Sequence, residues 1–182
     1  AAIGFAQAAG VPYELGIIRN HYVGRTFIQP TQSVRELGVR LKHSANRAVI
    51  EGRRITLVDD SIVRGTTSRK IVKMMREAGA TEVHFRIASP PIKFPDFYGI
   101  DMPEKDNLLA ARMSLDEMRA YLGVESLAFI SIDGLYRALG ETGRNAVLPQ
   151  YTDHYFTGDY PTPITDLIGE GPKQLSLLAE AS

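Results

Sequence analysis

Two adjacent carboxylates and a hydroxyl-rich loop are the residues of this sequence best suited to chemistry. Asp59 and Asp60 follow directly after the short apolar run 55–58, and residues 61–68 place hydroxyl groups around Gly65. Neighbouring carboxylates accept hydrogen bonds from vicinal hydroxyls or help to hold a hydrated Mg²⁺. A glycine lets the backbone approach an anion closely, and hydroxyl groups donate to it. The stretch therefore predicts a site that binds a sugar diol at one end and a phosphate at the other.

The elements on either side must place this loop at the edge of a sheet. Residues 55–58 are apolar and partly β-branched, which is typical of a buried strand. Downstream, apolar residues recur at helical spacing and Gly79 follows them, which predicts an amphipathic helix with apolar positions Ile71, Met74, Met75 and Ala78. The N-terminus of such a helix carries unpaired N–H groups and a partial positive charge, so the loop that enters it suits a phosphate.

The same residues also have a simpler interpretation. Asp59 and Asp60 could end a strand, and residues 66–68 could only cap a helix. A lone Asp-Asp pair would favour that interpretation. The complete order of strand, acids, hydroxyl-glycine loop and helix favours the binding site.

Alternating strand and helix patterns indicate the fold class. Apolar strands are expected at 83–87 and 127–130, and helices at 107–122 and 133–139. This alternation predicts an α/β fold with a mainly parallel sheet and helices on both faces. From residue 141 onward glycine, proline and acids predominate without periodicity. We therefore expect one domain over residues 1–140 and a C-terminal extension over residues 141–182, ordered only where it packs on the domain or on a partner.

Composition excludes several classes of protein. The formal net charge of the 182 residues is zero, which argues against a general nucleic-acid or membrane-surface binder. There is no cysteine, so a disulfide, a thiolate metal site or a cysteine nucleophile within this chain is excluded. No apolar run approaches the roughly 20 residues that span a bilayer. A cytoplasmic location is the default expectation.

Three segments resemble one enzyme family. LVDDSIVRGTTS at 57–68 resembles the PRPP-binding motif (PRPP, 5-phosphoribosyl 1-pyrophosphate) of type I phosphoribosyltransferases, in the form carried by the amidophosphoribosyltransferases. NHYVGRTFIQP at 20–30 and FYGIDMP at 97–103 are similar to the same family. The resemblance implies a type I phosphoribosyltransferase fold. It also implies a strand and a loop before residue 1, so we expect a piece of a longer polypeptide that is inactive alone.

The resemblance assigns roles to the central loop. Asp59 and Asp60 would hold the ribose hydroxyls, directly or through Mg²⁺, and the residues after them would cradle the 5-phosphate. The PRPP-binding residues implied in this way are Asp59, Asp60, Ser61, Val63, Arg64, Gly65, Thr66 and Thr67.

Residues 20–30 resemble a flexible loop that orders over bound PRPP. Such a lid excludes water from the oxocarbenium-like C1. Arg25 would neutralise the pyrophosphate and would so join Asp59 and Asp60 as a catalytic residue. The lid residues implied are Tyr22, Arg25, Thr26, Phe27 and Ile28. Composition alone leaves open a solvated, mobile surface loop.

The implied reaction is the displacement of pyrophosphate from PRPP by ammonia, which gives 5-phosphoribosylamine in de novo purine synthesis. The family also implies an N-terminal glutaminase domain that supplies the ammonia, purine nucleotides as feedback inhibitors, and a homo-oligomer. Some members hold an iron–sulfur cluster through cysteines near the positions of Asp96 and residues 151–155. No such cluster is expected here, because the chain has no cysteine.

Two other functions remain open at this point. One is a phosphoribosyltransferase with a nucleobase acceptor, which predicts a hood over the base and no lid of the YVGRTFI type. The other is a non-catalytic regulator on the same fold that senses PRPP and binds RNA or DNA. The neutral charge and the lack of a dedicated basic helix speak against the regulator.

Overall fold

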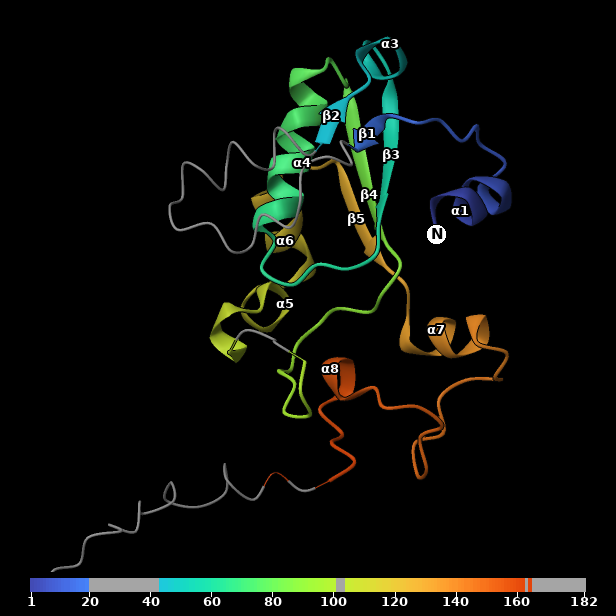
Figure 1. The fold of residues 1–182 in the computed structure, drawn as a ribbon, viewed down its shortest axis with the longest axis vertical. Helices are drawn as coiled ribbons and strands as arrows, with labels where there is room; N and C mark the ends of the chain where they lie inside the picture. Colours follow the sequence, from blue (N-terminus) through green and yellow to red (C-terminus); the bar gives the residue numbers. More distant parts are fainter. Residues whose placement is uncertain (20–42, 101–103, 163, 165–182) are drawn as a thin grey trace, which may run out of the picture.

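A parallel sheet of three strands forms the centre of the computed structural model, which describes residues 1–19, 43–100, 104–162 and 164 (Figure 1). The strands β3 (Arg54–Asp59), β4 (Glu82–Ile87) and β5 (Ser126–Phe129) pair in that order. Parallel neighbours need a crossover connection. The helix α4 (Thr66–Glu77) joins β3 to β4, and α6 (Leu115–Leu122) precedes β5.

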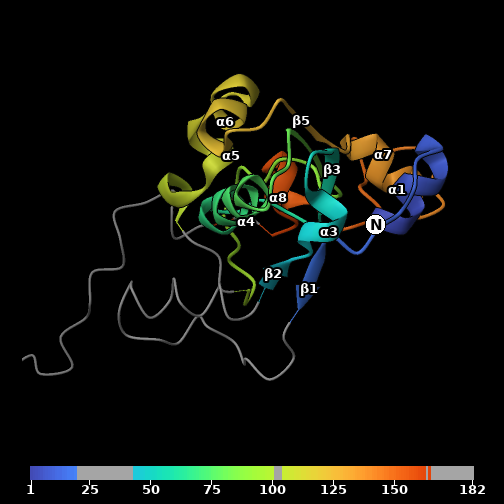
Figure 2. The same cartoon turned by 90° about the horizontal axis from the view of Figure 1, so that it is seen from above.

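Helices cover both faces of this sheet, as Figure 2 shows from above. One face carries α4, α6 and the short α5 (Leu109–Arg112), which follows the 3₁₀ turn Lys105–Asn107. The other face carries α1 (Ala2–Ala9) and α7 (Ile132–Ala138). The predicted α/β fold with a parallel sheet and helices on both faces is confirmed.

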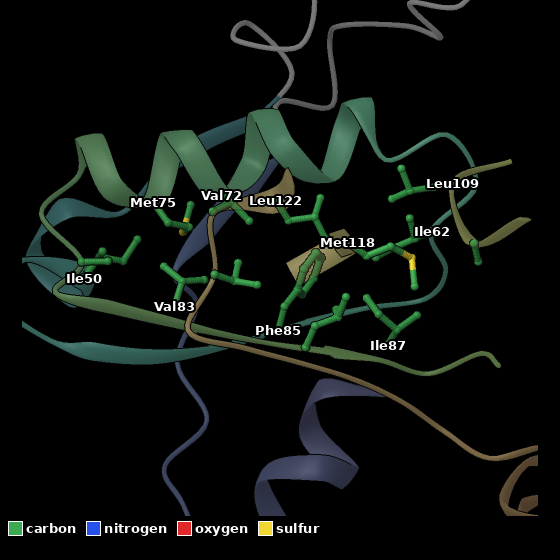
Figure 3. Packing of buried hydrophobic residues seen from close by; sticks show 14 of the residues in the cluster. Ile50, Ile62, Val72, Met75, Val83, Phe85, Ile87, Leu109, Met118 and Leu122 are labelled. Carbon is green, nitrogen blue, oxygen red and sulfur yellow. The ribbon is translucent and has the colours of Figure 1, made fainter. Parts of the chain in front are cut away.

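The core lies between the sheet and the layer formed by α4 and α6 (Figure 3). Val83, Phe85 and Ile87 alternate along β4 and are at most 3% exposed, because successive side chains of a strand point to opposite faces. They meet buried residues of α4 and α6, namely Val72, Met75, Met118 and Leu122. Ser114 followed three residues later by Glu117 predicts a capping box, and α6 begins with one. The Ser114 side chain accepts the Glu117 N–H, and the Glu117 carboxylate accepts the Ser114 N–H.

The first 50 residues add a small antiparallel ribbon. The strand β1 (Ile17–Arg19) pairs with β2 (His43–Ala45), and α3 (Arg47–Ile50) follows. The apolar residues Ile17 and Ile18 predict a strand over residues 13–18, and the structure has the strand at Ile17–Arg19; no strand is predicted from the sequence where β2 lies. A cleft of about 450 Å³ lies between α1 and β3, and Phe5, Ile17 and Ile55 contribute to its lining.

The described residues after 140 pack on the carboxyl end of the sheet rather than extending away from it. Backbone N–H groups of Lys93 and Phe94 donate to the carbonyl of Tyr155 in the short α8 (His154–Thr157). His154 Nε2 lies 2.8 Å from Asp96 Oδ1, and both side chains are 1% exposed. Order in this segment comes from individual hydrogen bonds between polar groups, which leave no periodic signal in the sequence.

A second buried group fixes the same segment to α7. The hydroxyl of Tyr136 donates to Asp153 Oδ2 over 2.8 Å, and Arg144 forms an ion pair with the same carboxylate. Burial by itself would raise the pKa of Asp153. Hydrogen bonds from Arg144, Tyr136 and Thr157 outweigh that effect and hold the pKa of this carboxyl below its usual value. None of the helices in the described part of the chain is long and apolar enough to cross a membrane.

Replacement of Asp153 by Asn should destabilise the fold by about 3 kcal/mol, because Arg144 then loses its buried counter-charge. Asp159→Asn is the matched control, since Asp159 pairs with the same Arg144 but is 62% exposed; it should cost less than about 1 kcal/mol. The measurement is urea unfolding of each variant.

Acid should remove the difference between Asp153→Asn and the wild type. The pKa of Asp153 is lower in the folded protein than in the unfolded chain, so its charge stabilises the fold above the unfolded value of about 3.9. This stabilisation disappears as the pH falls through the folded value. A stability gap between the two proteins that stays constant below about pH 4 would contradict this assignment.

Candidate functional site

The site predicted from the sequence is the turn that joins β3 to α4 at the carboxyl end of the sheet (Figure 1). Strand β3 ends at Asp59, residues 60–65 form the turn, and α4 begins at Thr66. We call residues 60–65 the β3–α4 loop. Ligands of open α/β sheets bind at this end of the strands.

The two carboxylates occupy different environments. Asp59 is half-buried and accepts the backbone N–H of Asp60 over 3.0 Å, whereas Asp60 is exposed and accepts the Ser61 hydroxyl over 2.9 Å. Burial raises the pKa of Asp59, the N–H of Asp60 lowers it, and the negative charge of Asp60 raises it further, with a net increase. Neither carboxylate forms an ion pair with a residue that the structure describes. Both remain able to accept hydrogen bonds from a diol or to bind a cation.

The first turn of α4 suits an anion. No side-chain hydrogen bond from the N-cap residue caps this helix of 12 residues, and its first turn contains no acid. Its initial N–H groups and the positive end of its dipole therefore favour an anion. Thr66 and Thr67 are exposed, as is Arg64 in the loop. Ser68 is only 4% exposed, so its hydroxyl is not presented at the loop surface with those of the two threonines.

Gly65 has a structural reason to be glycine. Its φ of +76° lies in the left-handed region. A Cβ added there would stand 2.6 Å from Leu109 Cδ2 and 3.2 Å from Tyr121 Cε1. The close approach to α5 and α6 therefore requires glycine even without a ligand, and its contact with an anion stays a prediction.

Sequence reasoning missed the part played by Leu109. This leucine is 0% exposed, and its backbone N–H donates to the carbonyl of Val63 over 2.8 Å. In the sequence it is one apolar residue of an expected helix, so no local signal connects it with a loop more than forty positions earlier. Only the packing of α5 against the loop reveals the contact.

The structure brings together one of the two predicted groups of site residues. The eight predicted PRPP-binding positions are all the residues from Asp59 to Thr67 except the buried Ile62, and they lie in the β3–α4 loop and at the two element ends beside it. The predicted lid lies outside the described residues, and with it Tyr22, Arg25, Thr26, Phe27 and Ile28.

The sequence also predicts that the loop of residues 89–103, which follows the strand 83–87, borders the site, because ligands of open α/β sheets bind beyond the strand ends. Residues 101–103 lie outside the described residues, and Tyr98 and Ile100 are exposed on the described part, residues 89–100. Asp96 Oδ2 accepts the backbone N–H groups of Tyr98 and Ile100 over 3.0 and 2.7 Å. The carboxylate of Asp96 thus fixes the shape of this loop from inside the protein.

Metal binding at the site would need oxygen atoms from a ligand. Among the described residues no group of three or more His, Cys, Asp or Glu side chains could hold a metal ion. Asp59 and Asp60 offer two carboxylates, and Mg²⁺ is commonly held by one or two carboxylates together with substrate phosphates and water. The donor set fits an ion that arrives with a phosphorylated substrate.

Comparisons with known proteins agree on one family, although no protein-family model matches the chain. It is 65% identical over 181 residues to the amidophosphoribosyltransferase of Rhizobium etli, with 98% of this chain and 36% of the relative covered. It is 56% identical over 164 residues to the amidophosphoribosyltransferase of Bacillus subtilis, and this match covers 90% of this chain and 34% of the relative. Amidophosphoribosyltransferase 2, chloroplastic, of Arabidopsis thaliana is 54% identical over 172 residues, and this match covers 94% of this chain and 30% of the relative.

Solved structures give the same result. The glutamine PRPP amidotransferase of B. subtilis, complexed with ADP and GMP, superimposes with a TM-score of 0.74 at 54% identity and covers 90% of this chain. The match covers 36% of that structure, so the chain spans about a third of the length of the relatives it matches. The chain is therefore homologous to the phosphoribosyltransferase region of the amidophosphoribosyltransferases, as its three sequence motifs predicted.

Proposed function

We propose that this chain is the phosphoribosyltransferase portion of an amidophosphoribosyltransferase, which acts in de novo purine synthesis. In the complete enzyme, ammonia would attack C1 of PRPP, and the bond between C1 and the pyrophosphate oxygen would break. The products are 5-phosphoribosylamine and pyrophosphate, with one proton released from the attacking nitrogen. The observation that carries the proposal is the order of groups at the end of β3: two carboxylates without ion partners among the described residues, then an uncapped helix N-terminus.

The residues of the β3–α4 loop would bind the two ends of the sugar phosphate. Asp59 and Asp60 would accept hydrogen bonds from the 2- and 3-hydroxyls of the ribose. The backbone N–H groups of residues 63–67 and the hydroxyls of Thr66 and Thr67 would donate to the 5-phosphate. No covalent nucleophile is required, because fixed orientation alone can supply roughly 7–11 kcal/mol of the barrier.

Two further elements complete the proposed site. Mg²⁺ would be held by Asp59 and Asp60 together with oxygen atoms of PRPP, and it would supply positive charge to the substrate phosphates. The lid, with Arg25, Tyr22, Thr26, Phe27 and Ile28, would close over the pyrophosphate and keep water from C1. Ammonia would then be the only nucleophile near the reacting carbon.

The remaining proposed partners are those that the family resemblance implies. A glutaminase domain of the same polypeptide would produce the ammonia, purine nucleotides would inhibit by feedback, and homo-oligomers would form. The B. subtilis relative is described as a complex with ADP and GMP, which supports nucleotide regulation. We expect a cytoplasmic location, although relatives in Arabidopsis thaliana are named chloroplastic.

The direct test of the proposal is pyrophosphate release from PRPP by a full-length polypeptide that carries residues 1–182. Release should require ammonia or glutamine and should depend on Mg²⁺. Competition by a purine or pyrimidine base as acceptor, without any reaction of ammonia, would indicate a nucleobase phosphoribosyltransferase instead. No release with any acceptor would support a regulator that only senses PRPP.

Replacement of both Asp59 and Asp60 by Asn should abolish PRPP binding in the full-length polypeptide. The loss of both charges removes the proposed diol acceptors and the proposed Mg²⁺ ligands. Calorimetric titration with PRPP and Mg²⁺ measures the effect. Asp116→Asn is a suitable control, because Asp116 is an acid on α6 whose side chain is 91% exposed. The PRPP affinity of this variant should match that of the wild type. Unchanged PRPP affinity in the double variant would rule out the proposed role.

The single replacement Asp59→Asn should weaken PRPP binding without lowering the stability of the ligand-free protein. The pKa of Asp59 is raised in the folded state, so ionisation of this carboxyl opposes folding at neutral pH. This penalty is absent below the unfolded pKa and complete above the folded one. The melting temperature at pH 7 should therefore equal or exceed that of the wild type, and the gain should vanish near pH 3, roughly one unit below the unfolded pKa. A lower melting temperature at pH 7 would show that the charged carboxylate supports the fold.

A further inference from the structure

We propose that Leu109 is a positioning residue for the site: it holds residues 63–65 in their phosphate-binding shape before any ligand arrives. Leu109 opens α5 and would not touch the substrate itself. The proposal rests on the function proposed above, because it concerns the loop that would bind the 5-phosphate. Three contacts of the loop with α5, α6 and the core carry it.

The first contact is a backbone hydrogen bond. The N–H of Leu109 donates to the carbonyl of Val63 over 2.8 Å, which turns that carbonyl toward α5. In a planar trans peptide the C=O and the N–H point in opposite directions. The N–H of Arg64 belongs to the same peptide, so it is directed away from α5. A carbonyl turned the other way would present a negative dipole to a bound anion.

The second contact is made by the leucine side chain. Leu109 Cδ2 lies 2.6 Å, and Cδ1 3.5 Å, from the position that a Cβ of Gly65 would occupy. Leu109 is 0% exposed and belongs to the same buried cluster as Ile62, the buried apolar residue of the loop (Figure 3). Ile62 is itself 2% exposed. The inner side of the loop therefore packs on the core at Ile62 and at Gly65.

The third contact joins the first turn of α4 to α6. The ring of Tyr121 approaches Gly65, with Cε1 at 3.2 Å from the same Cβ position. The guanidinium of Arg69 lies 5.0 Å from the centre of this ring. The loop and the start of α4 thus meet α5 and α6 on one side, and Arg64, Thr66 and Thr67 are exposed.

A loop held in this way binds with less loss of conformational entropy. Ordering a flexible loop on binding reduces affinity, and a preformed loop avoids that cost. Removal of the Leu109 side chain should leave a space behind Gly65 into which the loop can relax. The amides of residues 64–66 would then lose their fixed direction in the ligand-free protein.

The test compares two leucines in the full-length polypeptide. Leu109→Ala and Leu122→Ala remove the same atoms from side chains that are 0% and 2% exposed in one core cluster. No atom of Leu122 is among the three that come nearest to the Cβ position of Gly65, whereas two of those three belong to Leu109. Both variants should show a lower melting temperature. At a temperature where circular dichroism shows both to be folded, Leu109→Ala should weaken PRPP affinity at least tenfold. Leu122→Ala should change it less than twofold.

Amide hydrogen exchange provides a readout that does not depend on PRPP. Exchange at residues 64–66 of the ligand-free protein should accelerate in Leu109→Ala and remain at the wild-type rate in Leu122→Ala. If an alanine variant does not fold, Leu109→Val and Leu122→Val repeat the comparison with a smaller change. Leu109→Met, which keeps most of the side-chain volume, should restore most of the affinity.

Two results would overturn the proposal: equal loss of affinity in the two leucine variants, or unchanged exchange at residues 64–66 in Leu109→Ala. Failure of the wild type to bind PRPP would instead remove the proposed function. In that case the exchange comparison alone would still decide whether Leu109 fixes the loop.

Discussion

The packing of the β3–α4 loop against the core is the constraint on which the candidate site depends. Ile62 and Leu109 bury the apolar inner side of the loop, and Gly65 allows the close approach to α5. Because the apolar groups face inward, the polar groups of the loop lie on its exposed side. Thr66 and Thr67, at the start of α4, are exposed as well. A loop that was polar on both sides would have no such preference and would have to be ordered by its ligand.

The two neighbouring carboxylates are made unequal by the end of the strand. Asp59 is the last residue of β3 and shares its partial burial, whereas Asp60 has left the sheet and is exposed. The half-buried carboxylate has a raised pKa and has no cation beside it among the described residues. A buried charge without a partner costs stability, and such a cost is common where a residue serves binding rather than folding.

At the carboxyl end of the sheet, segments that are far apart in the sequence contact one another. Asp96 meets His154, and Asp153 meets Tyr136 and Arg144. His154 Nδ1 has no hydrogen-bond partner among the described residues, and the ring of His154 makes tilted contacts with the rings of Tyr155 and Tyr160, at centroid distances of 4.0 and 5.0 Å. These contacts hold the described residues after 140 against the loop of residues 89–100, the loop expected to border the site.

The amino-acid sequence by itself determined the α/β class, the parallel strands, the helix α4 and the capping box of α6. Each depends on local periodicity or on a cap within four residues, so the information is contained in a short window. The resemblance to the family was also recognisable from the sequence, because each of its three motifs is one continuous stretch of residues. The division at residue 140, the lid and the PRPP-binding roles stay predictions.

Only the tertiary structure decided the features that arise from distant contacts. It paired β1 with β2, buried Ser68 beside exposed Thr66 and Thr67, and placed Leu109 behind Gly65. It also gave the described part of the segment after residue 140 an ordered path, through the buried carboxylates Asp96 and Asp153. The physical reason is the same in each case: burial, the pKa of a carboxyl and the room for a Cβ depend on neighbours that the fold, not the local sequence, brings within a few ångströms.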